Sequence, residues 1–205
     1  FTTIPVDGGV NANIVPPNTK YTWTVAANSN VNGQQNQLVP QASISQVLTN
    51  LTNVVQTVVY TVTPISGTNG ACFGNTFTIT VTVNPKVTIP NQVVSICSEG
   101  SFSLTPATFT GVTIIPVGST FSWPMPTLSG TITGAATGAN QNFVFGTLTN
   151  PTNTEQTAVY TITPLSGNCT GNVFTISVEV KPKPHLSSAT TAPTICTNSL
   201  FNYAA

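Results

Sequence analysis

Apolar and polar residues alternate along several short stretches of the chain. Residues 77–83 read FTITVTV, so every second side chain is apolar and the side chains between them are threonines. The segment around Val58, Tyr60 and Val62 alternates in the same way. Strict alternation predicts antiparallel strands with one buried face and one hydrated face. Because Gly, Pro and Asn clusters interrupt these strands about every ten residues, the sequence predicts an all-β fold of immunoglobulin-like antiparallel β-sandwiches.

The whole pattern occurs twice. Residues 48–64 read LTNLTNVVQTVVYTVTP, and residues 148–164 repeat this as LTNPTNTEQTAVYTITP. ICSEGSFSLTP at 96–106 returns in part as ICTNSLFNYAA at 195–205. A unit of about 100 residues has the size of a domain, so a tandem array of domains is predicted. We expect residues 1–86 to form a repeat without its N-terminal start, 87–183 a complete repeat, and 184–205 a linker and the start of a third repeat.

Short proline-containing segments follow the last predicted strand of each repeat, at residues 83–91 and 180–188. Proline removes a backbone donor and stiffens the chain, so these linkers are expected to be semi-rigid. Residues 44–51 are ambiguous between helix and strand. Their counterpart at 142–150 is rich in aromatic and β-branched residues, which favours strand or loop.

Aromatic residues recur at equivalent positions of the two copies. The matching pairs are Trp23 with Trp123 and Tyr60 with Tyr160. All four are predicted to anchor the hydrophobic cores, because they fall within the alternating strands; stacking of a ligand on the tryptophans is the alternative.

Charge is almost absent, with only 4% of residues charged and a net charge of zero. A typical soluble domain has about 25% charged residues. There is no arginine, and the four lysines form no patch, which argues against nucleic-acid binding. The four acidic residues are scattered, so neither a calcium cage nor a pair of catalytic carboxylates is expected. No apolar run reaches the ~20 residues that span a bilayer, and membrane insertion is not expected.

The sequence offers no constellation for catalysis or metal binding. The only histidine, His185, lies in a proline-rich linker, and the only aspartate, Asp7, lies in a glycine turn. A hydrolytic triad requires both beside one serine. No cysteine spacing resembles a zinc site. We therefore predict no catalytic residue, no metal and no cofactor.

The four cysteines fall at recurring positions. One occurs just before the first predicted strand of a repeat and one in the turn between its last two strands, and we expect these places to lie at one end of a sandwich. This predicts a disulfide between Cys97 and Cys169, with partners for Cys72 and Cys196 outside this sequence. A Cys72–Cys97 bond across the domain junction and free thiols remain as alternatives. Disulfides would imply an oxidising, extracytoplasmic compartment.

The two copies differ most in two loops, at residues 26–37 and 129–140. Binding residues often lie on loops held by a rigid scaffold. Two triplets, Asn50–Thr52 and Asn168–Thr170, match the N-glycosylation pattern, although chance matches are common in a chain this rich in Asn and Thr. The candidate binding residues are Asn28, Asn30, Gln34, Gln35, Asn36, Thr137, Asn140 and Gln141.

Several motifs in combination resemble a known family. The motif VYT(V/I)TP, the cysteine-Gly-Asn turn and the closing V-P-K resemble the PKD-like, immunoglobulin-like repeats of giant Bacteroidota surface proteins, and they look most like the gliding-motility adhesins exported by the type IX secretion system. The likeness covers nearly the whole chain. It implies a β-sandwich fold, display on the outer-membrane exterior of a Gram-negative cell, and no catalytic residue.

Two functions fit this reading. In the first, the chain is a segment of a cell-surface adhesin, used as shaft or adhesive surface in attachment or gliding. Its expected partners are a surface polysaccharide, a glycan or a solid substratum, together with neighbouring repeats and laterally associated copies. Alternatively, it is a passive spacer that presents another domain, or a structural subunit of a surface filament.

Overall fold

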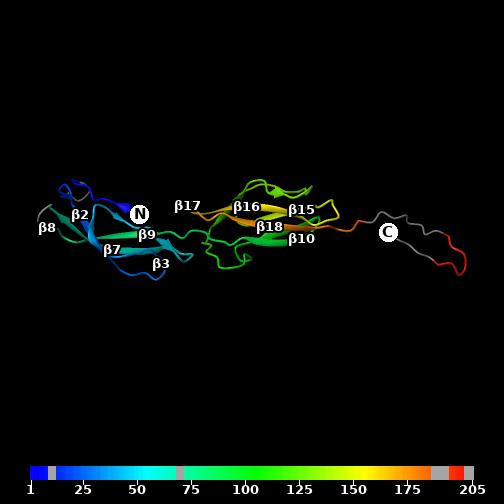
Figure 1. The fold of residues 1–205 in the computed structure, drawn as a ribbon, viewed down its shortest axis with the longest axis horizontal. Coiled ribbons are helices and arrows are strands. Elements are labelled where there is room, and N and C mark those ends of the chain that lie inside the picture. The colour runs from blue at the N-terminus through cyan, green and yellow to red at the C-terminus, as the bar shows by residue number, and fades with distance from the viewer. Residues whose placement is uncertain (9–12, 68–71, 186–193, 201–205) are drawn as a thin grey trace.

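The structure, a computed structural model, describes residues 1–8, 13–67, 72–185 and 194–200. Figure 1 shows two groups of strands that follow one another along the long axis of the molecule and are joined by one extended segment. Every regular element among the described residues is a strand. Within these ranges, no helix has the length and apolar character needed to cross a bilayer. The predicted class, tandem immunoglobulin-like β-sandwich domains, is confirmed.

The first repeat is built around its longest strand, β7 (Gln56–Ser66). Two strands, β2 (Lys20–Val25) and β9 (Phe77–Val83), pair antiparallel with β7. The sheet continues from β2 to β4 (Gln37–Gln41), and β8 (Cys72–Phe73) pairs with the end of β7. Opposite this sheet lie two short pairs, β1 (Thr2–Thr3) with β5 (Ile44–Ser45) and β3 (Val31–Asn32) with β6 (Thr49–Asn50).

The second repeat has the same plan around β16 (Gln156–Ser166). Its main sheet runs in the order β10 (Gln92–Cys97), β18 (Phe174–Lys181), β16, β12 (Thr120–Trp123) and β14 (Gly138–Gln141). Two short strands, β13 (Thr127–Leu128) and β17 (Cys169–Thr170), also pair with β16. The opposite layer is the antiparallel pair of β11 (Gly100–Leu104) and β15 (Val144–Leu148).

One pairing departs from an all-antiparallel sandwich. Strand β10 runs parallel to β18, with Gln92 opposite Ile176 and Cys97 opposite Lys181. The chain then turns through Ser98 and Glu99 into β11 of the other layer. The first strand of the repeat therefore lies at the edge of the main sheet and ends, at Cys97, where β18 ends.

The alternation seen in the sequence corresponds to burial. In β18 every second side chain is buried, from Phe174 to Val180, and the residues between them are partly exposed. Within residues 44–51, β5 and β6 are strands and residues 46–48 connect them, so the prediction of strand or loop for this stretch is confirmed. Trp23 and Tyr60 lie in the first core, and Trp123 and Tyr160 lie in the second.

The linker between the repeats is anchored in the second repeat. Val87 and Ile89 belong to the core of that repeat, and the Asn172 N–H donates to the Val87 carbonyl at 3.0 Å. Pro85, just before them, is buried. Because the linker enters the second core within a few residues, its conformation is restrained by packing as well as by its prolines.

The predicted Cys97–Cys169 disulfide is contradicted by the strand register. Cys97 lies opposite Lys181, beside the start of β16 at Gln156, whereas Cys169 lies opposite Ser166 at the other end of β16. Ten residues of extended strand span about 33 Å, whereas a disulfide requires Cα atoms within about 7 Å. All four cysteines are free thiols in the structure. The prediction failed because Cys97 ends the first strand and does not precede it.

Candidate ligand-binding grooves

Both repeats contain an open groove at the same place, between the tryptophan-bearing strand and the strand of the opposite layer. The groove volumes are ≈ 500 Å³ in the first repeat and ≈ 400 Å³ in the second. The groove of the first repeat is lined by Trp23, Gly33, Gln35, Gln37, Gln41, Ser43, Ser45, Gln46 and Val47. That of the second is lined by Ser101, Phe102, Ser103, Trp123, Gly134, Ala136, Thr137, Phe143, Phe145, Gly146 and Thr147.

The frame of the groove is the same in the two repeats. The Trp23 indole N–H donates to the Gln35 carbonyl at 3.1 Å, and the Trp123 indole N–H donates to the Ala136 carbonyl at 3.0 Å. Each loop reaches this position through a glycine with φ near +90°, a conformation that side chains rarely adopt. A buried tryptophan thus fixes the loop backbone while one edge of its ring still lines the groove.

The lining of the groove differs between the repeats. Ser43 and Ser45 of the first repeat correspond to Phe143 and Phe145 of the second, at the same offset of 100. Phe145 packs edge-on against the Trp123 ring, with centroids 6.2 Å apart, and Phe143 lies 5.1 Å from Phe145. Both phenylalanines remain partly exposed, at 39% for Phe143 and 45% for Phe145. One scaffold therefore carries a polar groove in the first repeat and an aromatic groove in the second.

Neither groove has a charged residue among its lining side chains. Amide, hydroxyl and aromatic groups with exposed backbone carbonyls suit a neutral ligand with donors, acceptors and an apolar face. Among the described residues, no three metal-ligating side chains lie close enough to hold an ion. Asp7 accepts a hydrogen bond from the Val15 N–H at 2.8 Å within its own turn.

The structure separates the predicted binding residues into two groups. Gln35 and Thr137 line the grooves. Others hold their own loop in shape, because Asn28 donates to the Thr57 carbonyl at 3.0 Å and Asn36 accepts from the Val25 N–H at 2.8 Å. Gln34 likewise donates to the Asn28 and Val31 carbonyls, the Asn30 N–H donates to Asn28, and Asn140 and Gln141 lie on strand β14.

Sequence reasoning missed the residues contributed by the opposite layer. Gln46, Phe143, Phe145 and Gly146 lie outside the two divergent loops, yet they line the grooves. A signal for them was present in the sequence, because Gln46 aligns with Gly146 while the neighbouring core positions, Ile44 and Val144, stay apolar. Residues 41–47 and 141–147 share only the glutamine at their first position, so the two repeats differ in chemistry here as they do in the divergent loops.

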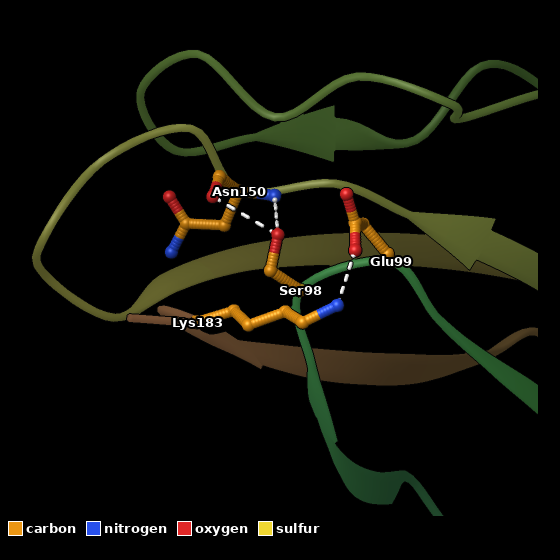
Figure 2. Close-up of polar contacts among 4 residues, drawn as sticks. All are labelled: Ser98, Glu99, Asn150 and Lys183. Carbon is orange, nitrogen blue, oxygen red and sulfur yellow. Dashed lines mark hydrogen bonds and ion pairs between the residues drawn. The ribbon is translucent and has the colours of Figure 1, made fainter. Parts of the chain in front are cut away.

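A cluster of polar residues lies outside the grooves, at the end of the second repeat where β10 turns into β11. It consists of Ser98, Glu99, Asn150 and Lys183 (Figure 2). The Lys183 ammonium lies 2.6 Å from the Glu99 carboxylate. Their hydrogen bond and opposite charges lower the pKa of Glu99 and raise the pKa of Lys183. Both side chains are more than half exposed, so this pair adds little to stability.

Asn150 is buried at this end of the repeat, next to the buried Ser98. Its Nδ2 donates to the Thr154 and Val180 carbonyls, and its Oδ1 accepts from Thr152. Asn50 makes the same set of bonds in the first repeat. The amide of the Asn50–Thr52 triplet is therefore engaged inside the fold, whereas Asn168 of the other triplet is exposed.

Two segments of the chain match the same protein family. A family model described as a PKD-like domain matches residues 3–87 and, a second time, residues 94–184. These two segments contain both grooves and nearly all of the two groups of strands seen in Figure 1. No curated protein is similar enough to the chain to count as a match.

Proposed function

The chain belongs to the PKD-like domain family, with two copies in series, and we propose that it is a non-catalytic segment of a long extracellular adhesin that binds glycans through the aromatic groove of its second repeat. The observation that carries this proposal is the pair of equivalent grooves with one frame and two linings. A purely structural repeat has no reason to keep an open, tryptophan-framed groove while changing only what lines it.

The setting follows from resemblance. The chain is similar to the repeats of gliding-motility adhesins of Bacteroidota, and on that basis we place it on the outer-membrane exterior of a Gram-negative cell, exported by type IX secretion and used in attachment or gliding. The low charge supports a role in attachment, because an almost uncharged chain is only weakly repelled by a charged polysaccharide coat.

Stacking of a sugar ring is the chemistry that we assign to the aromatic groove. Phe143 and Phe145 present partly exposed rings beside Trp123. Rings of this kind supply a large apolar contact at a low cost in conformational entropy. Hydroxyl and amide groups of a glycan would meet the backbone carbonyls and the Ser101, Ser103 and Thr137 hydroxyls at the rim.

The alternative function is a passive spacer, and the linker favours it. Val87 and Ile89 are fixed in the second core, and the turn at Gly167 and Asn168 lies beside residues 53–55 of the first repeat. Such a joint restrains the angle between repeats and would hold a terminal domain away from the cell. Lateral assembly into filaments is a further proposal, supported by Leu38 and Val39, which are exposed on the edge strand β4.

Retention on immobilised glycans separates the adhesin from the spacer. We expect the 205-residue chain to be retained on at least one polysaccharide surface, and the double variant Phe143→Ser, Phe145→Ser, which installs the residues of the first repeat, to lose that retention. Phe73→Ser is the matched control. Phe73 is an exposed phenylalanine, at 69%, but it lies in the first repeat, away from the aromatic groove of the second repeat. Absence of retention on every surface, with an extended rod in small-angle scattering, would favour the spacer.

A further inference from the structure

The groove of the second repeat lies over a buried hydroxyl that has no hydrogen-bond partner. Tyr160 is 1% exposed, and its Oη is the one buried side-chain oxygen or nitrogen without a partner among the described residues. Leaving a hydroxyl buried and unpaired costs about 1–3 kcal/mol. The equivalent hydroxyl in the first repeat, that of Tyr60, donates to the Gln46 Oε1 at 2.7 Å. The two repeats therefore differ at the floor of the groove.

The difference comes from one residue. Gln46 follows β5 and pairs with Phe1, whereas Gly146 lies within β15 and pairs with Phe102. The rings of Phe1 and Phe102 lie at the same 5.3 Å from the tyrosine of their own repeat. A Cβ atom on Gly146 would lie 3.2 Å from the Tyr160 Oη. The space that a side chain fills in the first repeat is thus adjacent to the unpaired hydroxyl in the second.

The Gln46 carboxamide shows what fits there. Its Oε1 accepts from the Tyr60 hydroxyl and also from the Gln35 N–H at 3.1 Å. Its Nε2 donates to the Gln35 carbonyl at 2.5 Å, the same carbonyl that accepts from the Trp23 indole. One amide group therefore satisfies a tyrosine hydroxyl and both polar groups of one loop residue.

The second repeat keeps this frame and lacks the amide. Trp123 donates to the Ala136 carbonyl, and Ala136 occupies the position of Gln35. Phe143 and Phe145 lie beside this position on the open side of the groove. The missing group is an amide, and the surrounding surface is aromatic and uncharged, as a neutral ring bearing an amide requires.

We infer that the groove of the second repeat binds the acetamido group of an N-acetylated sugar. The acetamido carbonyl accepts from the Tyr160 hydroxyl and the Ala136 N–H, as the Gln46 Oε1 accepts from the Tyr60 hydroxyl and the Gln35 N–H in the first repeat. The Phe102 ring, which a Cβ atom on Gly146 would meet at 2.9 Å, shifts aside to admit the group. The sugar ring packs on Phe143 and Phe145. This inference rests on the proposed adhesive function and names its ligand class.

The first repeat does not bind such a ligand, because its own Gln46 occupies the position. The serines at 43 and 45 also leave its groove without the aromatic surface. The site is therefore open in the second repeat, whereas in the first repeat the Gln46 side chain fills the equivalent position.

A titration of the full chain with N,N′-diacetylchitobiose, followed by the indole and amide NMR signals, tests the inference. We expect saturable shifts of the Trp123 indole and the Ala136 amide, with the Trp23 indole unchanged. Cellobiose is the matched probe, because it has the same ring and linkage with hydroxyls in place of the acetamido groups. It should bind at least about tenfold more weakly, the factor expected for losing about one net hydrogen bond.

Two variants define the site. Gly146→Gln installs the internal amide and should abolish the Trp123 shifts while the chain stays folded. Tyr160→Phe removes the hydroxyl and should weaken binding about tenfold. Three results would overturn the inference: cellobiose binding as tightly as N,N′-diacetylchitobiose, shifts of the Trp23 indole, or full binding by Gly146→Gln. Absence of any shift with N,N′-diacetylchitobiose would also overturn it, and would indicate that a buried water bonds to the Tyr160 hydroxyl. Retention of the chain on glycans without acetamido groups would refute this ligand class and leave the adhesive function standing.

Discussion

Ser98 and Asn150 exchange two hydrogen bonds across 52 residues of sequence (Figure 2). The Ser98 hydroxyl donates to the Asn150 carbonyl at 3.0 Å, and the Asn150 N–H donates to the Ser98 Oγ at 2.9 Å. The Asn150 side chain bonds in turn to the carbonyls of Thr154 and Val180. These contacts tie the start of β11, the end of β15 and the end of β18 together at one end of the repeat.

Loss of the Asn150 amide should therefore destabilise the second repeat. Asn150→Ala leaves the Thr154 and Val180 carbonyls without their donor, and we expect the free energy of unfolding to fall by about 3 kcal/mol. Denaturant unfolding measures it. Asn153→Ala, at an exposed position three residues away, is the control and should have little effect. A loss below about 1 kcal/mol for Asn150→Ala would show that the network is dispensable.

Reducing agents should leave stability unchanged. Because Cys97 and Cys169 lie at opposite ends of β16, no bond forms between them within one chain. We expect the same melting temperature with and without reductant, and no Cys97–Cys169 peptide in a non-reducing digest. The double variant Cys97→Ser, Cys169→Ser serves as the control. Detection of that linked peptide in the folded monomer would refute the strand register described above.

Stability should be nearly independent of pH between about 5 and 9. The pKa of Glu99 is lowered by its hydrogen bond with Lys183, so its small contribution is present above its unfolded pKa and lost as the pH falls through the folded value. The pKa of Lys183 is raised, so its contribution is lost only as the pH rises through that higher value. Burial also raises the pKa of Tyr160, which adds a further loss at alkaline pH.

Melting temperatures recorded across this range check the expectation. Glu99→Gln is the matched variant, and it should follow the wild type closely, because the ion pair is exposed. A shift of several degrees between pH 5 and 9 would point to an ionisable group with a larger role than these.

Gly134 should tolerate no side chain, because its φ is +89° and a Cβ atom would collide with the Thr147 carbonyl oxygen. We expect Gly134→Ala to cost about 3 kcal/mol, from the left-handed backbone and the collision together. Gly118→Ala is the matched control, since Gly118 has a φ of +79° and open space around it, and its cost should be about 1 kcal/mol.

Urea unfolding of the two variants compares them directly. Equal losses for Gly134→Ala and Gly118→Ala would mean that the contact with Thr147 is unimportant and that only the backbone conformation matters. A larger loss for Gly134→Ala would support a rigid groove frame, in which this glycine lets the loop pass close to β15.

Sequence patterns predicted the strands and the repeat because both depend on local periodicity. The alternation in residues 77–83 and 174–180 reports directly which side chains face the core. The core positions of Trp23, Trp123, Tyr60 and Tyr160 follow from that alternation in the same way. Residues 44–51 were identified as strand or loop only through their second copy.

Features that depend on how the layers meet could not be read from the pattern. The position of Cys97 is set by the parallel pairing of β10 with β18, which leaves no mark in the local sequence. Asn28 looked like a ligand-binding residue, but it holds its loop by bonding to Thr57 across the sheet. The role of Gln46 and Gly146 depends on their contact with Tyr60 and Tyr160, fourteen residues further along the chain, and the local sequence does not indicate this contact.

The number of acetamido-sugar sites per chain tests the central claim most directly. Calorimetric titration with N,N′-diacetylchitobiose should give one site for the wild type and none for Gly146→Gln. It should give two for Gln46→Gly, the new one weaker because Ser43 and Ser45 line its groove. A stoichiometry that stays the same in all three proteins, or two sites in the wild type, would contradict the account.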